Sequence, residues 1–197
     1  MNTKNITLIV IGVLILFLGF SGCNGYNGLV RGDQDVKKAW SNVETNYQRR
    51  TDLYSSVVKT IEGSANFEKT TLTAVIAARA SATQVKVDIN DPATLQKYQA
   101  AQGQLQSAFG RLMAVAEAYP NLKTTQSFQD FQTQIEGTEN RINIARRDYN
   151  ELVNSYNLSV KSFPNNIFAN IFGFKEKAYY EADKGAEKNP DIKFDIK

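Results

Sequence analysis

The apolar positions of the chain predict a series of long amphipathic helices. In the first, apolar residues recur at alternating steps of four and three, from about Asp33, a residue type that suits a helix N-cap, to Glu62. Arg50 occupies the one polar slot in this stripe. The apolar members of the stripe are Val36, Trp40, Val43, Tyr47, Tyr54, Val57 and Ile61.

Three further segments show helical spacing. The second, from about Asn66 to Val87, contains many alanines, so we expect it to pack closely against its neighbours. The third begins at Asp91 and Pro92, an N-cap followed by a first-turn proline. The fourth is the longest, and its stripe has a period of about 3.5 residues, which is typical of helices packed side by side. Its members are Phe128, Phe131, Ile135, Thr138, Ile142, Ala145, Tyr149, Leu152 and Tyr156.

These patterns predict an all-α protein. Four amphipathic helices with short connections form an antiparallel up-and-down four-helix bundle, and the long first and fourth helices favour a rod-like shape. The sequence contains no sustained alternation of apolar and polar residues, so we expect no sheet. We assign the bundle to residues 33–180 and expect the charged residues 181–197 to form a flexible tail.

A short helix with an apolar face is expected after Phe163. In an antiparallel bundle the end of the fourth helix returns to the anchored end of the molecule, so this segment would emerge near the membrane. Lys175 and Lys177 follow it, and aromatic faces beside lysines are typical of helices at a membrane surface. The alternative is that the segment folds back and caps the bundle. The candidate contact residues are Ile167, Phe168, Ile171, Phe172 and Phe174.

Residues 1–22 have the layout of a signal peptide or hydrophobic anchor. From Ile6 to Phe20 there is no charge and no proline, and Lys4 precedes this run. Small residues directly before Cys23 resemble a bacterial lipobox, so we expect Cys23 to carry lipid; an uncleaved single-pass signal anchor is the alternative. Residues 23–32, rich in Gly and Asn, are interpreted as a linker. Either anchor leaves most of the chain outside the bacterial cytoplasmic membrane.

Composition excludes several classes of function. The formal net charge of +3 is too small to indicate nucleic-acid binding. Without histidine, the chain lacks histidine-activated nucleophiles, histidine-containing zinc sites and histidine-ligated haem. A single cysteine leaves no internal disulfide. We therefore expect no enzyme, no metal and no cofactor.

A charged cluster lies inside the first predicted helix. Arg49, Arg50 and Asp52 could bind an anion or a partner protein. The alternative is that Arg50 extends from the edge of the stripe into solvent, or pairs with an acid on a neighbouring helix.

Short polar sequence motifs between the apolar stripes resemble motifs of the LemA family. They include "YNGLV" at Tyr26, "RRTDL" at Arg49, "IEGTENRI" at Ile135, "RRDYNELVNSYN" at Arg146 and "FGF" at Phe172. The resemblance covers residues 26–180. One departure is "YSSVV" from residue 54, where the family has an Ile-Pro-Asn type of stretch.

The resemblance implies an antiparallel helical bundle tethered outside the cytoplasmic membrane by an N-terminal anchor. It brings no established catalytic activity and no agreed active-site residues. We therefore expect a non-enzymatic scaffold or adaptor that binds an envelope protein. The alternative is a lipid-binding or membrane-organising protein that acts through the segment after Phe163. The polar candidates for partner contact are Arg49, Arg50, Asp52, Glu139, Asn140 and Arg141.

Overall fold

The computed structural model describes residues 3–62, 69–120 and 125–181. Over these ranges the protein is all-α, as the sequence predicts, and contains no strand. The helices are α1 (Thr3–Glu62), α2 (Lys69–Gln84), α3 (Pro92–Ala116), α5 (Gln126–Lys161) and α6 (Asn165–Phe172).

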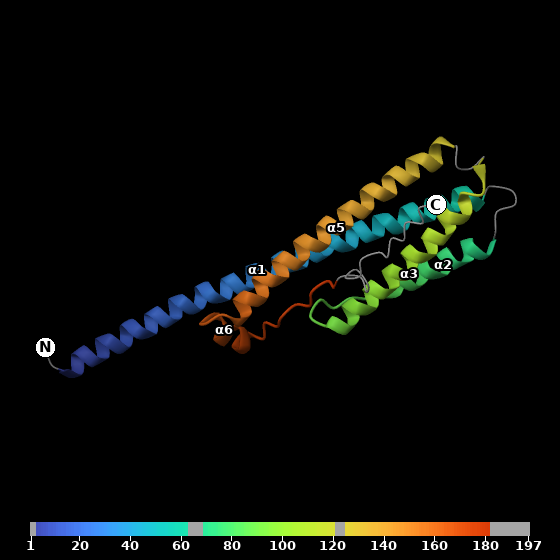
Figure 1. Ribbon diagram of the computed structural model, residues 1–197. Helices are drawn as coiled ribbons and strands as arrows, with labels where there is room; N and C mark the ends of the chain where they lie inside the picture. Colours follow the sequence, from blue (N-terminus) through green and yellow to red (C-terminus); the bar gives the residue numbers. More distant parts are fainter. Residues whose placement is uncertain (1–2, 63–68, 121–124, 182–197) are drawn as a thin grey trace, which may run out of the picture.

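Helix α1 is the axis of an elongated molecule (Figure 1). Its 60 residues correspond to about 90 Å, and the 36 residues of α5 to about 54 Å. Helix α5 runs antiparallel to α1 along much of its length, while α2 and α3 form a hairpin beside the end of α1 that is far from the N-terminus. The N-terminal part of α1 projects beyond the other described helices.

Residues 23–32 belong to α1 and are not the linker that the sequence analysis assigned. Three glycines in and before this stretch lie where other side chains approach the helix closely. A Cβ atom would lie 3.1 Å from the Phe168 ring at Gly22, 2.9 Å from Asn165 Oδ1 at Gly25, and 3.0 Å from the Tyr156 ring at Gly32. We call these three residues the glycine face of α1. Its glycines accommodate close packing instead of ending the helix.

The remaining helix boundaries follow local signals. Asp91 caps α3 by accepting a hydrogen bond from the backbone N–H of Ala93 at 2.9 Å, and Pro92 begins the helix, as predicted. Helix α6 ends at Gly173, whose φ of 77° is the left-handed conformation that glycine adopts most easily. The predicted short helix after Phe163 is therefore present.

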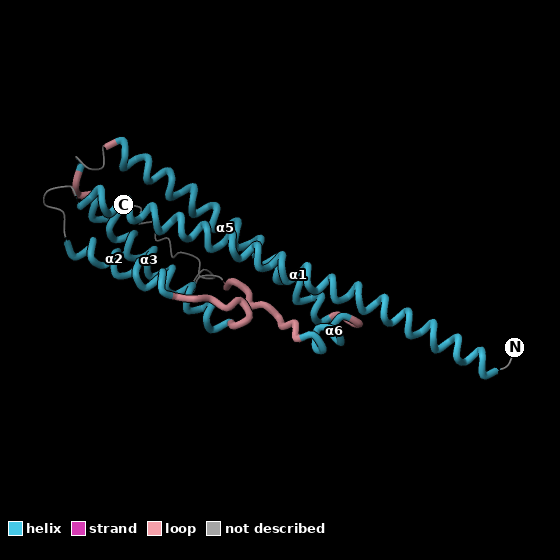
Figure 2. The backbone as a smooth tube through the Cα atoms, turned by 180° about the vertical axis from the view of Figure 1, so that it is seen from behind, coloured by secondary structure: helices cyan, strands magenta, loops and turns pink. Residues whose placement is uncertain are grey.

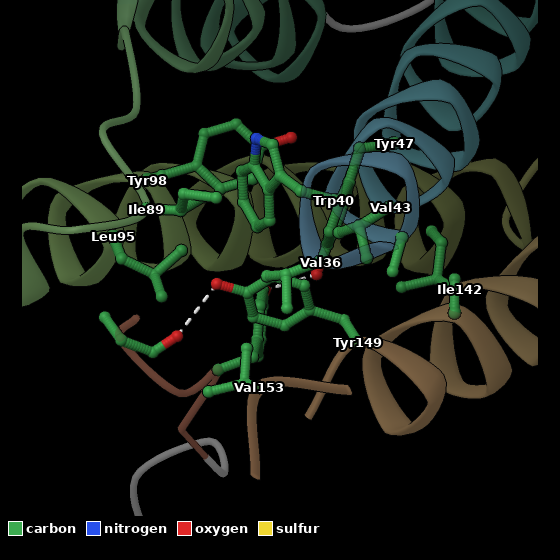
Figure 3. Close-up of a cluster of buried hydrophobic side chains, with 14 of the residues drawn as sticks. Val36, Trp40, Val43, Tyr47, Ile89, Leu95, Tyr98, Ile142, Tyr149 and Val153 are labelled. Carbon is green, nitrogen blue, oxygen red and sulfur yellow. Dashed lines mark hydrogen bonds between the residues drawn. The ribbon is translucent and has the colours of Figure 1, made fainter. Parts of the chain in front are cut away.

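Two apolar clusters form the core. The distal cluster joins α1, α2, α3 and α5, with Tyr54 stacked on Phe109 at a centroid distance of 3.7 Å. The central cluster joins α1, α3, α5 and the residues after α6. In it, Trp40 contacts Tyr98 and Tyr149 edge to face, at centroid distances of 5.6 and 5.4 Å (Figure 3).

An extended segment follows α6. Residues 174–181, which we call the C-terminal strap, run back from α6 along α5 towards the start of α3 (Figure 2). The strap closes one side of the central cluster with Ala178 and Tyr180. The flexible tail expected for residues 181–197 lies outside the described residues except for Glu181.

The described helices differ from membrane spans in length or composition. None of the described helices combines the length and apolar character needed to cross a bilayer.

Candidate functional site

Arg50 is the centre of a buried polar layer between the two apolar clusters. Its side chain is only 2% exposed. Nη1 donates to Glu139 Oε1 at 3.2 Å, and Nη2 donates to the side-chain and backbone oxygens of Gln102 at 2.7 and 3.2 Å. The guanidinium also lies 4.7 Å from the centre of the Tyr47 ring and 5.7 Å from that of Tyr54. The interpretation that Arg50 pairs with an acid on a neighbouring helix is confirmed.

Glu139 connects this arginine to a tyrosine. Tyr54 donates its hydroxyl hydrogen bond to Glu139 Oε1 at 3.3 Å. Burial raises the pKa of Tyr54 above its ordinary value, so the hydroxyl stays neutral and remains a donor. A buried guanidinium is costly unless it is paired, and Glu139 together with Gln102 supplies that pairing.

A cavity of about 250 Å³ lies beside Arg50. We call it the Arg50 cavity. In the described part of the chain, Arg50 Nε and Gln99 Nε2 are buried N–H groups with no hydrogen-bond partner, and both side chains line this cavity. Side chains of α1, α3, α5 and the strap form its wall: Tyr47, Arg50, Gln99, Gln102, Gly103, Gln106, Glu139, Ile142, Asn143, Arg146 and Tyr180.

Two asparagines of α5 hold the strap. Asn157 donates to the backbone carbonyl of Lys177 at 2.9 Å and accepts from its N–H at 2.8 Å. Asn150 makes the same pair of bonds with Tyr180, both at 2.8 Å. Because these bonds involve only backbone atoms of the strap, they fix its register on α5 without selecting its side chains. The Tyr180 hydroxyl also hydrogen-bonds that of Tyr47, at the Arg50 cavity.

Lys177 joins the strap to α1. It is 6% exposed, and its ammonium lies 2.6 Å from Asp33 Oδ1 and 2.8 Å from Asn90 Oδ1. Burial on its own would raise the pKa of Asp33, but hydrogen bonds from Lys177 and Lys37 outweigh burial and lower it. Burial also raises the pKa of nearby Tyr156 to about 12. Asp33 is therefore ionised at neutral pH and pairs with a buried cation.

Helix α6 contacts α1 and also leaves an apolar surface open. Phe168 packs against the glycine face, and Tyr26 contacts Phe172 and Phe174 edge to face at 4.8 and 5.8 Å. The segment therefore does fold back on the bundle. Yet three side chains of α6 stay exposed, Ile171 at 68%, Phe172 at 56% and Ile167 at 48%. Phe163, just before the helix, is exposed as well, at 80%.

A shallow groove follows the contact between α1 and α5. It has a volume of about 520 Å³ and contains charged side chains of both signs. We call it the α1–α5 groove, and it is lined by Asp35, Lys38, Ala39, Asn42, Thr45, Asn46, Arg141, Ile144, Ala145, Asp148 and Leu152.

The polar candidates from the sequence separate into three locations. Arg50 and Glu139 meet in the buried layer. Arg141 lines the α1–α5 groove. The other three, Arg49, Asp52 and Asn140, are exposed on α1 and α5, and so is Cys23.

Sequence reasoning missed the residues that attach the strap. Asn150 and Asn157 are seven residues apart, so they lie on the same face of α5 two turns apart, and this spacing is visible in "RRDYNELVNSYN". Gln102 was recognisable only as a polar break in the stripe of the third helix. Nothing in the sequence indicates that Lys177 is buried.

The described residues contain no group of three or more His, Cys, Asp or Glu side chains that could hold a metal ion. Over the same residues, the geometry of the polar layer offers hydrogen bonding and charge.

The comparison with protein families decides the family of this chain. A model described as "LemA family" matches residues 39–194. The chain belongs to the LemA family. Among relatives of this LemA-family protein, Magnetosome protein MamQ 2 of Paramagnetospirillum magneticum is 27% identical over 186 residues, covering 85% of this chain and 68% of the relative. Protein LemA of Metamycoplasma hominis is 27% identical over 158 residues, covering 80% of this chain and 69% of the relative. Magnetosome protein MamQ of Magnetospirillum gryphiswaldense is 26% identical, with 85% and 68% covered.

Proposed function

We propose that this LemA-family protein is a non-enzymatic scaffold or adaptor, anchored to a membrane of the bacterial cell envelope. The observation that supports this most is the continuity of α1. One helix runs from Thr3, at the apolar N-terminal segment, to Glu62, which directly follows Ile61 of the distal cluster. The bundle is then a rigid extension of its anchor.

The length of α1 sets how far the protein reaches. The helix between Cys23 and Glu62 spans about 60 Å at about 1.5 Å per residue. The glycine face brings α6 and Tyr156 close to α1, which supports the N-terminal half of the helix against bending. We take α1, α2, α3 and α5 as an up-and-down four-helix bundle that stands away from the membrane on this axis.

The anchor itself is proposed from the sequence. Cys23 is exposed, which leaves it open to lipidation, and an uncleaved signal anchor over residues 1–22 serves the same purpose. Relatives whose names assign them to the magnetosome fit a membrane-associated role for this chain.

The α1–α5 groove is the surface that we assign to an envelope protein partner. It lies on the two longest helices and combines Arg141 with acidic side chains and the 40% exposed Ile144. Mixed charges around an exposed aliphatic side chain suit a protein surface better than an anionic lipid surface, which selects positive charge alone.

In-cell photo-crosslinking tests the adaptor function. A photoreactive phenylalanine analogue at Asn42, in the groove, should give a discrete protein adduct, and the additional change Arg141→Glu should weaken it. The same analogue at exposed Gln104 on α3 is the matched control and should give no such adduct. Recovery of lipid alone from Asn42 would refute an adaptor role for the groove.

A second function is favoured by the exposed surface of α6. Ile171 and Phe172 lie open beside the part of α1 that leads to the anchor, so they suit contact with a membrane surface. In liposomes that contain brominated lipids, a tryptophan at Phe172 should be quenched, while buried Trp40 serves as the internal reference. Equal and weak quenching of both tryptophans would contradict membrane contact.

A further inference from the structure

We propose that Asn143 of α5 binds the backbone of Asp183, and that residues 182–184 thereby continue the strap across the Arg50 cavity. The proposal goes beyond the scaffold function and does not depend on it, because it concerns a contact within the chain. Residues 182–184 directly follow Glu181, the last residue of the strap.

The two observed attachments of the strap have a regular register. Asn157 pairs with the backbone of Lys177, and Asn150 pairs with the backbone of Tyr180. From one attachment to the next, α5 advances by seven residues, or about 10.5 Å at about 1.5 Å per residue. The strap advances by three residues, or about 10 Å at about 3.3 Å per extended residue. Because these two rises match, the same step can be repeated along α5.

One further step in this register leads to Asn143 and Asp183. Asn143 precedes Asn150 by seven residues, and Asp183 follows Tyr180 by three. Seven residues return a helical side chain to nearly the same face, with a drift of only about 20°. Asn143 and Tyr180 both line the Arg50 cavity, so Asn143 lies on the side of α5 that the strap follows. Within the described chain, the Asn143 amide has no hydrogen-bond partner.

The end of the strap is held close to this position. Gln96 Nε2 donates to Glu181 Oε1 at 3.1 Å, and Arg146 donates to the backbone carbonyl of Glu181 at 3.2 Å. Asp183 is two residues further along the chain, which is about 7 Å when extended. A segment tethered so closely has a much higher effective concentration at the site than a free peptide or a second copy of the chain. The tether therefore favours residues 182–184 of the same chain as the occupant.

The Arg50 cavity offers further donors to the same segment. Arg50 Nε, on a side chain that is 2% exposed, and Gln99 Nε2 are buried N–H groups without a partner in the described chain. Both side chains line the cavity together with Asn143. Because Glu139 already pairs with the charge of Arg50, a neutral oxygen suits these donors better than an anion. Extended backbone supplies one such carbonyl oxygen at every residue.

Amide hydrogen exchange of the full-length, detergent-solubilised protein, read residue by residue by NMR, tests the pairing. In the wild type, the Asp183 amide should exchange at least about tenfold more slowly than in an unstructured chain. Asn143→Ala should abolish this protection. Asn140→Ala, at another exposed asparagine of α5, is the matched control and should leave the protection unchanged. Alanine is the better helix former at both positions, so both variants should fold.

A second pair of variants tests the same contact from the side of the C-terminal segment. Proline has no backbone N–H, so Asp183→Pro removes the donor to Asn143 Oδ1, whereas Lys184→Pro leaves that donor in place. Both prolines are compatible with an extended chain. The ¹⁵N signal of the Asn143 side-chain amide should therefore shift in Asp183→Pro and stay in place in Lys184→Pro.

Three results would overturn the proposal. The first is an Asp183 amide that is unprotected in the wild type or keeps its protection in Asn143→Ala. The second is an Asn143 signal that responds equally, or not at all, to the two prolines. The third is protection of Asp183 that rises with protein concentration, which would assign the site to the C-terminal segment of a second copy.

Discussion

The pairing of Arg50 with Glu139 can be measured by a double-mutant cycle. At their 3.2 Å separation the Coulomb attraction is about 5 kcal/mol for an effective dielectric constant of about 20. Desolvation of the guanidinium offsets part of this, and Gln at position 139 keeps an oxygen acceptor, so we expect Glu139→Gln to cost about 2 kcal/mol. Arg50→Met removes three hydrogen bonds and should cost about 3 kcal/mol.

Because the double variant no longer contains an unpaired buried charge, it should lose about 1.5 kcal/mol less than the sum of the two single changes. Urea unfolding, followed by the fluorescence of Trp40, the single tryptophan, measures each free energy of unfolding. Glu136→Gln, an exposed change one turn earlier on α5, should stay within about 0.5 kcal/mol of the wild type. A coupling energy near zero, or one abolished by 1 M NaCl as for a surface pair, would refute the reasoning.

Three further changes test the attachment of the strap, the ion pair between Lys177 and Asp33, and the space around α3 at Gly110. Asn157→Ala removes two hydrogen bonds to the Lys177 backbone and should cost about 2 kcal/mol in urea unfolding, with faster hydrogen exchange at the Lys177 amide; unchanged exchange would contradict the attachment. Asp33→Asn leaves Lys177 buried and should cost about 3 kcal/mol at pH 7. Lys177 and Lys37 lower the folded-state pKa of Asp33 despite its burial. The stability that Asp33 contributes is therefore complete above its ordinary pKa of about 3.9 and is lost as the pH falls through the lower folded-state value. A stability difference between wild type and Asp33→Asn that is undiminished at pH 2 would be inconsistent with this ion pair. Gly110→Ala should raise the free energy of unfolding by about 0.5–1 kcal/mol, because it adds helix propensity where nothing obstructs a methyl group; a loss of stability would show that the site is crowded.

Most of the helical fold could be predicted because its core is built from continuous apolar stripes. Val36, Val43 and Val57 are all 0% exposed, as their spacing indicates. The polar break at Arg50 was equally visible, and pairing with an acid on a neighbouring helix was one of the alternatives that the sequence left open. Which acid it pairs with depends on how α5 is aligned with α1, and the sequence of either helix alone does not determine that alignment.

The N-terminal half of α1 could not be predicted from local preference. Glycine and asparagine disfavour helix in isolation, which led to the assignment of a linker over residues 23–32. In the folded chain, Gly25 and Gly32 are the positions where Asn165, Phe168 and Tyr156 approach the helix, and tertiary packing outweighs the propensity.

The strap was missed for a different reason. Its residues have neither helical nor strand periodicity. The backbone groups of Lys177 and Tyr180 bond to asparagine side chains of α5, and those of Ala178 bond to Ile89 and Tyr149, instead of forming a regular ladder. Asn150 and Asn157 share one helix face, which is a weak sequence signal because polar residues on a helix face are usually solvated. The Arg50 cavity depends on the strap through Tyr180, so it was missed as well.

The proposed scaffold depends most directly on the continuity of α1 from the anchor into the bundle. Hydrogen exchange of the full-length protein in lipid nanodiscs, read by mass spectrometry, tests it over residues 23–32. If α1 is one rigid helix, the amides of these residues should exchange slowly, at rates close to those of residues 33–40. Complete exchange of residues 23–32 within seconds, with 33–40 still protected, would show a flexible linker and contradict the rigid scaffold.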